Sequence, residues 1–484
     1  MSEIENLTPQ AVWHFFYEIT QIPRPSKKEE KIAAYLVEFA KSHNLEHRRD
    51  SAGNVLILKK ASPGMEHRPT VVLQSHMDMV CEKNGDTSFN FETDPIRPRV
   101  EDGWVKATGT TLGADCGIGM AAELAVLAAT DLAHGPLECL FTVDEETGLT
   151  GAFGLGSDML TGKYLINLDS EDEGEIFIGC AGGVDTVATL HFRQENAPRT
   201  YDFFRIDIGG LSGGHSGDDI DKGRANSNKL LTRFLWRATR ELELRLVYFD
   251  GGNLRNAIPR EAFAVFGVPS REAKRLREYF EEYLDGVNRE FAPVEPGMSI
   301  SLSEMPSPDT VIDTDTQGRL LDALCGLPNG VLAMSPTMEG IVETSTNLAS
   351  VKFVGDRLIE ITTSQRSSIE SARDAAAAAV ESVLALAGAD VTHSDGYPGW
   401  NPNPESHLLD VTKKTYAKLF GVAPRVRSIH AGLECGLFLQ KYPWLDMVSF
   451  GPTLRGVHSP DERLEIASVD KFWKLLAGTL GALE

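Results

Sequence analysis

Five short polar clusters carry the side chains with which this sequence could do chemistry, and each follows or ends an apolar stretch. The clusters are QSHMDMV at 74–80, TTLGADCGIG at 110–119, FTVDEETG at 141–148, INLDSED at 166–172 and GVHSPDE at 456–462. Their candidate ligands are carboxylates and two histidines, without a cysteine. Imidazole and carboxylate are borderline-to-hard ligands, so the set suits a pair of divalent metal ions of the zinc, cobalt or manganese type.

The first cluster places His76 and Asp78 two residues apart, just after the apolar run 69–73. Side chains at positions i and i+2 of a strand leave the same face, so both can act on one object beyond the strand's carboxyl end. Taken alone, such a pair is more typical of a helix cap or of the protein surface. The downstream clusters at comparable places favour a metal site.

The third cluster contains the adjacent carboxylates Glu145 and Glu146. Neighbouring side chains project in different directions, so one can bind metal while the other stays free. A free carboxylate beside a metal-activated water is what a general base requires, because the metal ions lower the pKa of that water. An acidic surface turn is the commoner fate of such a string, but its position after the apolar run LECLFTV favours a site.

Apolar runs that alternate with helical patterns must position these clusters. Strand patterns occur at 53–60, 70–75, 137–146 and 164–170, and helical patterns at 9–20, 26–43 and 117–129. Ser26 and Glu29 have the spacing of a capping box that opens the second helix. Strands alternating with helices, with polar residues at the strand ends, predict an open α/β sheet with a site along its carboxyl edge.

After Gly183 the pattern changes to that of an α+β unit. Its strand and helix patterns lie at 201–210, 244–252, 270–291 and 369–387. A stretch rich in Gly, Pro and Asn at 394–407 is typical of a linker, and the α/β pattern resumes after it. We therefore predict a discontinuous catalytic domain of residues 1–186 and 397–484, with an inserted domain at 187–396.

The composition excludes some classes of partner. With 47 basic and 70 acidic residues the net charge is −23, which disfavours nucleic acid and anionic membranes. The start MSEIENLTPQ lacks a signal-peptide pattern, and long uncharged apolar stretches are missing, so we expect a cytoplasmic protein. The six cysteines are scattered, which predicts reduced thiols rather than a disulfide framework.

The motifs SHMDMV, GADCGIGMA, DEETG, NLDSED and HSPDE resemble those of the M20 metallopeptidases in their order and in their spread along the chain. Within that family they are most similar to the cytosolic aminoacyl-histidine dipeptidases, relatives of carnosinase. The resemblance implies hydrolysis of dipeptides including Xaa-His, such as β-Ala-His. It also implies a catalytic domain with a mixed, largely parallel sheet flanked by helices, and an inserted α+β lid through which two subunits form a homodimer.

The same resemblance implies two divalent metal ions per subunit, most simply Zn²⁺, with Co²⁺ or Mn²⁺ as alternatives. His76 and Asp169 would hold one ion, and Glu146 and His458 the other. Asp115 would bridge the two. A water that bridges the ions would then be the nucleophile that attacks the peptide bond.

Further roles follow from the resemblance. Asp78 would orient the His76 ring, and Glu145 would be the general base that deprotonates the water and passes the proton to the leaving amine. In the insertion, GGHSGDDI at 213–220 resembles the lid motif whose histidine approaches the active site of the other subunit. That histidine is His215. GGNLRNAIP and TTSQRSS place Asn256 and Arg366 on positions that resemble a substrate-binding asparagine and a carboxylate-binding arginine.

HAGLECG at 430–436 departs from the Asp-containing glycine loop of several M20 relatives by offering Glu434. This residue either receives the substrate's free amino group or is a structural acid in a tight loop. Two other functions compete with a dipeptidase. One is a related amidohydrolase, such as a tripeptidase or an N-acyl amino acid deacylase. The other is a non-catalytic binding protein, which the complete set of ligand positions and the base Glu145 disfavour.

Overall fold

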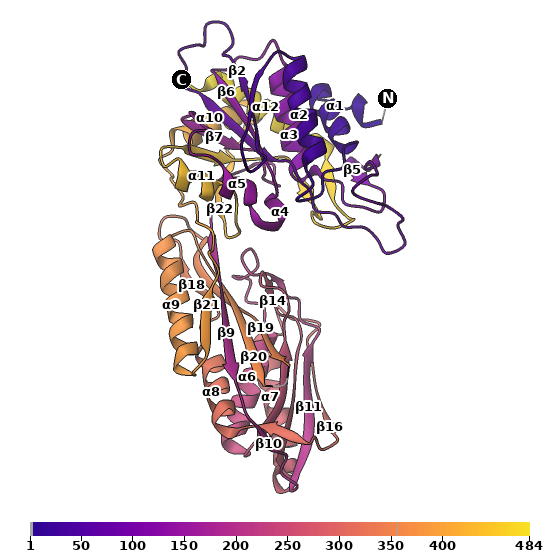
Figure 1. The fold of residues 1–484 in the computed structure, drawn as a ribbon, viewed down its shortest axis with the longest axis vertical. Coiled ribbons are helices and arrows are strands. Elements are labelled where there is room, and N and C mark those ends of the chain that lie inside the picture. The colour runs from indigo at the N-terminus through magenta and orange to yellow at the C-terminus, as the bar shows by residue number, and fades with distance from the viewer. Residues whose placement is uncertain (1–2, 356) are drawn as a thin grey trace. The chain divides into compact units, whose positions relative to one another are not determined.

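The computed structural model describes residues 3–355 and 357–484, and the chain forms two compact units (Figure 1). The first unit comprises Met1–Gly179, Trp400–Ser428 and Leu433–Glu484. The second comprises Cys180–Gly399 and the short segment Ile429–Gly432. The insertion predicted at 187–396 does not include that segment, which reaches the second unit from the far end of the chain.

The first unit is built on an eight-stranded sheet among its described residues. In spatial order the strands are β1 (Glu46–Arg49), β2 (Val55–Lys59), β6 (Leu137–Thr142), β3 (Val71–His76), β7 (Tyr164–Asn167), β23 (Asp446–Ser449), β8 (Glu175–Cys180) and β22 (Arg425–Ile429). The four central strands are parallel, and the flanking pairs β1–β2, β2–β6 and β23–β8 are antiparallel. All six residues of β3 are buried, as expected for a parallel strand covered on both faces. The predicted mixed, largely parallel sheet is confirmed.

Helices flank this sheet (Figure 1). They are α1 (Gln10–Thr20), α2 (Glu30–Ser42), α3 (Ala114–Ala128), α4 (Glu145–Gly148), α5 (Thr150–Gly154), α10 (His407–Phe420), α11 (Cys435–Lys441) and α12 (Ile466–Ala482). α1 packs on α3, which packs on β3, while α10 packs on α12 and β23. A small sheet of β24 (Leu454–Arg455), β25 (Arg463–Glu465), β5 (Trp104–Ala107) and β4 (Pro98–Glu101) completes the unit.

Helix α2 begins later than the predicted capping box. Its N-cap is Glu29, which makes no side-chain capping bond, and Ser26 instead donates its hydroxyl to Asp78 at 2.7 Å. The prediction for Ser26 is wrong, because its hydroxyl is taken up by a strong bond to the buried carboxylate of Asp78 and does not cap the helix. The expected strands at 53–60, 70–75, 137–146 and 164–170 are present as β2, β3, β6 and β7.

The second unit contains a nine-stranded sheet among its described residues. Its order is β16 (Ser299–Met305), β11 (Tyr201–Gly209), β15 (Ala262–Pro269), β13 (Arg245–Gly251), β19 (Val342–Val354), β20 (Leu358–Ser367), β9 (Gly182–His191) and β21 (Asp390–His393), and β18 (Gly330–Met334) also pairs with β19. Two-stranded pairs are β10 (Gln194–Asn196) with β17 (Thr310–Ile312), and β12 (Gly214–His215) with β14 (Ala257–Ile258). The pairings in the large sheet are antiparallel, as in the predicted α+β unit.

Four α-helices accompany this sheet in the described part of the unit, namely α6 (Ser227–Glu241), α7 (Ala273–Phe291), α8 (Thr314–Gly326) and α9 (Glu370–Leu386), and the short 3-10 helix η2 (Ser270–Glu272) precedes α7. α6 packs on β15 and β19, and α9 packs on β9 and β20. One apolar core fills the space between helices and sheet. The segment predicted as a linker holds an isolated bridge between Tyr397 and Gly183, so it is tied to the sheet.

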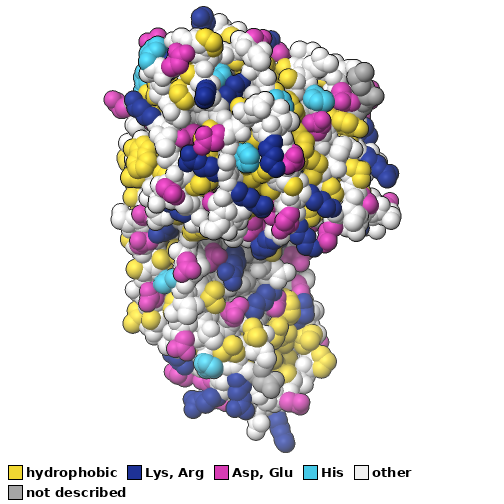
Figure 2. All heavy atoms as spheres, turned by 45° about the horizontal axis from the view of Figure 1, so that its top comes forward, with side chains coloured by type: hydrophobic (Ala, Val, Ile, Leu, Met, Phe, Trp, Pro, Cys, Tyr) yellow, Lys and Arg dark blue, Asp and Glu magenta, His cyan; other side chains and the backbone are white. Residues whose placement is uncertain are grey.

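Among the described residues, no helix combines the length and the apolar character that are needed to cross a membrane. On the face that Figure 2 displays, Lys and Arg side chains are interspersed with Asp and Glu side chains.

Candidate metal centre

The carboxyl ends of three parallel strands bring the polar clusters of the first unit together. His76 is the last residue of β3, Glu145 and Glu146 open α4 after β6, and Asp169 follows β7. Because β6, β3 and β7 are parallel neighbours, these ends meet at one edge of the sheet. Asp115 reaches the same place from the first turn of α3.

Asp115 lies between two histidines and turns one oxygen to each. Its Oδ1 is 3.2 Å from His76 Nε2, and its Oδ2 is 3.3 Å from His458 Nε2. Asp169 Oδ1 is 3.3 Å from His76 Nε2, and Glu146 Oε2 is 3.1 Å from His458 Nε2. The donors thus form two groups that share Asp115. The side chain of His76 is 1% exposed and that of His458 is 54% exposed, so the first group is buried and the second reaches the surface at its histidine.

These separations fit divalent metal ions. Two ligands that stand about 2.0–2.1 Å from one ion at the tetrahedral angle lie about 3.3 Å apart. The nitrogen-to-oxygen distances here are 3.1–3.3 Å. Glu146 Oε1 is buried and has no hydrogen-bond partner among the described residues, as expected for an oxygen that faces a cation. Imidazole with carboxylate suits zinc, cobalt or manganese.

The electrostatics of the group favour bound cations. Burial opposes the charged form of His76, yet Asp169 and Asp115 raise its pKa well above the usual range. Hydrogen bonds with Asp115 and Glu146 raise the pKa of His458 to about 11. Burial also opposes ionisation of Asp115, but the two histidines hold its pKa far below the usual value. The carboxylates therefore attract positive charge, which a divalent ion would supply.

Asp78 connects the ring of His76 to the turn that carries the two glutamates. Its Oδ1 lies 3.3 Å from His76 Nδ1 and accepts the backbone N–H of Glu145 at 3.0 Å. Its Oδ2 accepts the backbone N–H of Glu146 at 3.2 Å and the hydroxyl of Ser26 at 2.7 Å. Burial opposes its ionisation, but the bonds from His76 and Ser26 lower the pKa of Asp78 to about 2. Asp78 is therefore an anion that positions its neighbours.

The side chain of Glu145 makes no hydrogen bond or ion pair with the described residues, although its backbone is fixed. The turn before it is held by Asp144, whose N–H donates to Glu29 Oε1 at 3.0 Å. Burial, together with Asp169 and Glu146, raises the pKa of Glu145 well above its usual range. A free carboxylate with an increased proton affinity can accept a proton from a nearby water.

Cys116 lies beside this centre but is a poor ligand. Its sulfur, His76 and Asp169 offer ligand atoms within 4.8 Å of one another. The thiol donates to the carbonyl of Leu168 at 3.3 Å, and burial raises its pKa well above the usual range. Metals bind the thiolate, so a thiol that holds its proton strongly is a poor ligand.

Glu434 is fully buried beneath the same edge of the sheet. Its Oε2 accepts from Gln74 Nε2 at 2.6 Å and from Thr142 Oγ1 at 2.8 Å, whereas Oε1 has no hydrogen-bond partner among the described residues. Burial raises the pKa of Glu434 to about 8. Oε2 thus serves the structure, and Oε1 is available to a ligand as far as the described residues are concerned.

In the second unit, His215 is half-buried and its ring has a defined tautomer. Nδ1 accepts backbone N–H groups from Gly217 at 3.3 Å and Asp218 at 3.2 Å. These two contacts favour the neutral tautomer with its proton on Nε2, which can then donate a hydrogen bond, and Nδ1 also lies 3.4 Å from Asp218 Oδ2. The backbone N–H of His215 donates to Asp219 Oδ2 at 2.7 Å, which fixes the position of the residue.

Arg366 is buried in β20 of the second unit. Its Nε donates to Ser216 Oγ at 3.3 Å and its Nη1 donates to the hydroxyl of Tyr397 at 2.8 Å. Burial and then Arg366 lower the pKa of nearby His430 to about 4, so that ring is neutral at pH 7. The guanidinium thus faces neutral partners and suits an anion. Asn256 is exposed, and its backbone carbonyl accepts the backbone N–H of Ser216 at 2.8 Å.

Sequence reasoning did not identify Tyr397 or His430 as members of this group. Tyr397 lies in the string DGYPGW, within the segment whose composition predicts a linker. The one local sign of a further role for it is an aromatic side chain among Gly and Pro. His430 stands in the segment 429–432, where its Nε2 bonds with Ser345 Oγ at 2.8 Å. His430 contacts this group because the segment 429–432 belongs to the second unit, although the segments before and after it belong to the first. Local sequence patterns do not indicate such an exchange between units.

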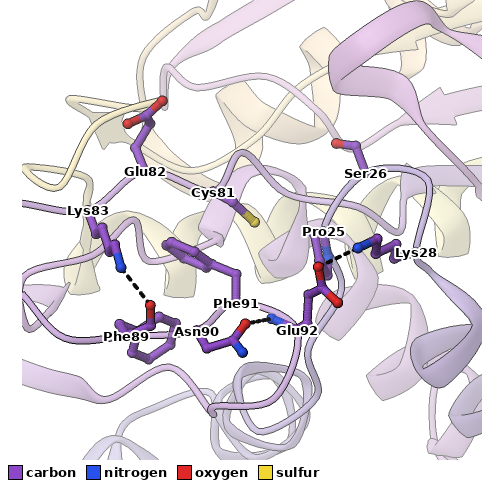
Figure 3. A pocket seen from close by; sticks show the side chains of 10 residues that line it. All are labelled: Pro25, Ser26, Lys28, Cys81, Glu82, Lys83, Phe89, Asn90, Phe91 and Glu92. Carbon is purple, nitrogen blue, oxygen red and sulfur yellow. Dashed lines mark hydrogen bonds and ion pairs between the residues drawn. The ribbon is translucent and has the colours of Figure 1, made fainter.

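A hollow of about 620 Å³ lies in the first unit beside the centre. Figure 3 shows the rings of Phe89 and Phe91 and the sulfur of Cys81 around it. Lys28 on its wall is neutralised by an ion pair with Glu92. Ser26, which also lines the hollow, donates to Asp78 and so joins this wall to the centre.

The chain is similar to known proteins over nearly its whole length. Residues 72–482 match the model of peptidase family M20/M25/M40. The chain is 46% identical over 480 residues to the cytosol non-specific dipeptidase of Escherichia coli (strain K12), covering 99% of each chain. The crystal structure of aminoacylhistidine dipeptidase from Vibrio alginolyticus is 45% identical, has a TM-score of 0.92, and is matched over 100% of this chain and 98% of its own. An aminopeptidase from Bacillus cereus, 17% identical with a TM-score of 0.59 over 99% of each chain, shares the fold.

Proposed function

The chain belongs to peptidase family M20/M25/M40, and from that premise we propose that it is a di-metal dipeptidase that hydrolyses dipeptides including Xaa-His, such as β-Ala-His. Two relatives that match nearly the whole chain support this substrate class. One is named a non-specific dipeptidase and the other an aminoacylhistidine dipeptidase. The first is also named as a cytosolic enzyme, which supports a cytoplasmic location for this chain.

The proposed metal ligands are the donors around Asp115. His76 and Asp169 would hold one ion, Glu146 and His458 would hold the other, and Asp115, which turns one oxygen to each histidine, would be a ligand of both. Their distances of 3.1–3.3 Å support this division. Zn²⁺ is the proposed metal, and Co²⁺ and Mn²⁺ satisfy the same donors.

Glu145 is the proposed general base. The bound metal ions would lower the pKa of water and polarise the scissile carbonyl. Glu145, which has free oxygens, takes the proton from the attacking water and returns it to the leaving amine. Asp78 orients the His76 ring through Nδ1 and holds the N–H of Glu145 in place.

Residues of the second unit are proposed to bind the substrate. Arg366 binds the α-carboxylate, because its buried guanidinium has two partners that are neutral hydroxyl groups. Asn256 is proposed to contact the peptide, and His215 to donate from Nε2 to the scissile carbonyl. Glu434 is proposed to receive the free amino group through its unpaired oxygen.

We further propose that the second unit is the lid and that it forms a homodimer in which His215 serves the partner's centre. The exposed apolar side chains of β18 support an interface with a second copy. Val331 is 36%, Leu332 44% and Met334 48% exposed on a strand that pairs with β19. Apolar side chains on a peripheral strand favour pairing with another chain.

The observation that carries the proposed function is the position of Asp115, whose two oxygens each face one histidine. The carboxylate of Glu145 lies within 4.8 Å of ligand atoms of His76 and Glu146 and makes no side-chain bond with the described residues. The test is an assay of the purified protein, loaded with Zn²⁺, Co²⁺ or Mn²⁺, on Ala-His and β-Ala-His. A tripeptide and an acetylated amino acid serve as comparison substrates. Metal content is measured on the same samples.

A dipeptidase cleaves the two dipeptides much faster than the comparison substrates and binds about two ions per chain. Preference for the tripeptide or for the acetylated amino acid would identify another amidohydrolase of the family. Metal binding without turnover of any of these substrates would favour a binding protein.

A further inference from the structure

The turn Leu112–Asp115, which delivers Asp115 to the centre, is held from two sides by buried side chains of opposite charge. Glu462 contacts the N–H groups of the turn, and Arg24 contacts its carbonyl side. Each of these side chains is 2% exposed. Neither residue is a candidate ligand, and each comes from a segment that carries or adjoins other residues of the centre.

Glu462 accepts four backbone N–H groups in succession. Its Oε2 accepts from Leu112 at 2.6 Å and Gly113 at 2.9 Å, and its Oε1 accepts from Ala114 at 2.7 Å and Asp115 at 3.3 Å. A carboxylate in this position satisfies the free N–H groups at the start of α3. It also ties that helix to the loop that contains His458, only four residues earlier.

Arg24 joins the same turn to the end of β3. Its Nη1 donates to the carbonyls of Met77 at 3.0 Å and Asp78 at 2.5 Å, and its Nη2 donates to the carbonyl of Gly113. Gly113 is therefore bonded to both charged side chains, through its N–H to Glu462 and through its carbonyl to Arg24. The segment that carries His76 and Asp78 is thus linked to the segment that carries Asp115.

Two glycines make room for the guanidinium. A Cβ atom on Gly113 would lie 2.6 Å from Arg24 Nη2, and one on Gly117 would lie 2.7 Å from it. Gly113 also has φ +70°, which a larger residue adopts only with strain. The glycines of the string GADCG therefore serve the contact with Arg24.

We propose that Arg24 and Glu462 are positioning residues that set the distance between the two metal positions. Together they connect the three segments that carry His76, Asp115 and His458, so the oxygens of Asp115 face both imidazoles before metal binds. The proposal rests on the proposed function, because it assumes that these three residues are ligands. Since the ligands would otherwise have to be ordered during binding, loss of either positioning residue should weaken metal binding.

The first test compares Glu462→Gln with a matched control, Glu138→Gln. Glu138 is also buried, and it accepts the N–H groups of Thr161 and Gly162 near the amino end of β6, away from the centre. Zn²⁺ affinity is measured on metal-free protein by competition with a chromophoric chelator, and stability by urea unfolding. We expect both variants to lose stability, and Glu462→Gln alone to lose about tenfold or more in Zn²⁺ affinity.

The second test compares Arg24→Lys with Arg68→Lys. Arg68 likewise donates to backbone carbonyls, those of Gly481 and Leu483, but it lies before the start of β3, whereas His76 is the last residue of that strand. Arg24→Lys should weaken Zn²⁺ binding, and excess Zn²⁺ should restore part of kcat. Arg68→Lys should leave both unchanged. The double variant of Arg24 and Glu462 should lose less affinity than the sum of the single losses, because both act through Gly113.

Wild-type metal binding separates the two proposals. If the wild-type chain binds no Zn²⁺ at all, the proposed function fails. Suppose instead that the wild-type chain binds Zn²⁺. The positioning role is then wrong if the Zn²⁺ affinity of the Arg24 and Glu462 variants stays within about twofold of the wild-type value, or if the control variants lose as much Zn²⁺ affinity. Should Glu462→Gln not fold, Glu462→Asp, which keeps the charge but shortens the reach, gives the same comparison.

Discussion

The carboxylate of Asp78 accepts the backbone N–H of Glu145 at 3.0 Å with the same oxygen that lies 3.3 Å from the ring of His76. A single buried oxygen therefore fixes the ring orientation of a proposed metal ligand, His76, and the backbone position of the proposed base, Glu145. Its partner oxygen holds Glu146 and Ser26. This arrangement explains why the sequence places an aspartate two residues after the histidine.

Asp78→Asn should impair both functions that this oxygen serves. The amide has one oxygen where the carboxylate has two, so one set of partners loses its acceptor. We expect kcat and metal affinity each to fall about 10- to 100-fold. Ser26→Ala, which removes one donor and leaves the carboxylate, should have a much smaller effect. Equal losses in the two variants would contradict the proposed role of Asp78.

Glu145→Gln should remove most turnover and leave the metal content near normal, because the proposed base is not a ligand. Loss of a general base costs about 10²- to 10⁴-fold in kcat. Glu146→Gln should instead lower the metal content, since this residue faces His458 at 3.1 Å. Equal metal loss in both variants, measured by elemental analysis, would show that the two roles are divided wrongly.

Much of the fold is visible in the sequence because its signals are local. The run Val71–Leu73 is apolar throughout and lies in a buried parallel strand, and the charged and Ala-rich segments at 270–291 and 369–387 lie in α7 and α9. The start of α2 was misplaced because Ser26 bonds with Asp78, which lies 52 residues away. Contacts of that kind leave no local pattern.

The candidate site shows the same division. The sequence predicts His76, Asp115, Glu146, Asp169 and His458 as one set because ligand-type residues stand at strand or loop ends, and the structure places these side chains near one another. Their side chains come together through the parallel order of the strands, which single motifs do not contain.

Residues that act through backbone atoms were not predictable. Arg24 and Glu462 contact carbonyl and N–H groups, so their partners carry no side-chain signature. Tyr397 depends on a bridge between distant segments. Sequence patterns report which side chains are present, whereas these contacts depend on how the backbone is folded.

Arg366→Ala should raise KM about tenfold or more for a free dipeptide, because a hydrogen bond to a charged group is worth about 1.5–3 kcal/mol. A C-terminally amidated analogue should be affected much less. Tyr397→Phe removes the acceptor at Nη1 and should give a smaller rise. Arg205→Ala, which breaks an ion pair with Asp207 elsewhere in the second unit, is the control. The same loss on both substrates would exclude recognition of the carboxylate.

Glu434→Gln should change the pH dependence of stability. Burial raises the pKa of Glu434 to about 8, so the folded protein binds a proton that the unfolded chain releases above its ordinary pKa. Stability of the wild type therefore falls as the pH rises from about 4.5 to about 8. Glutamine mimics the neutral acid, so the variant should match the wild type at low pH and exceed it at pH 8. Urea unfolding of metal-free protein measures this, and a difference that is constant with pH would contradict it.

His215→Ala and Glu145→Ala should complement each other if His215 serves the partner's centre. The His215→Ala subunit keeps an intact base, and the Glu145→Ala subunit keeps an intact histidine. In a mixed dimer that histidine completes the centre of the His215→Ala subunit, so one of the two sites works. With random reassembly of equal amounts, half of the dimers are mixed, and activity should return to about a quarter of the wild-type value by the symmetry of a twofold pair. His191→Ala, at an exposed position in the second unit, should be active by itself.

The mixed dimers are prepared by co-expression of the two variants with different tags and isolated by sequential affinity steps. Free of the parent homodimers, they should have about half of the wild-type activity, because one of their two sites is complete. Nδ1 of His215 accepts the N–H groups of Gly217 and Asp218, so Nε2 is the proposed donor. The His215→Ala homodimer lacks this donor, and the mixed dimer contains it once. Stabilising the developing oxyanion in this way is worth a few kcal/mol, roughly a 10²- to 10³-fold change in kcat. The parent homodimers should therefore be almost inactive. Isolated mixed dimers that are no more active than the parents would place His215 in its own subunit's site or outside catalysis.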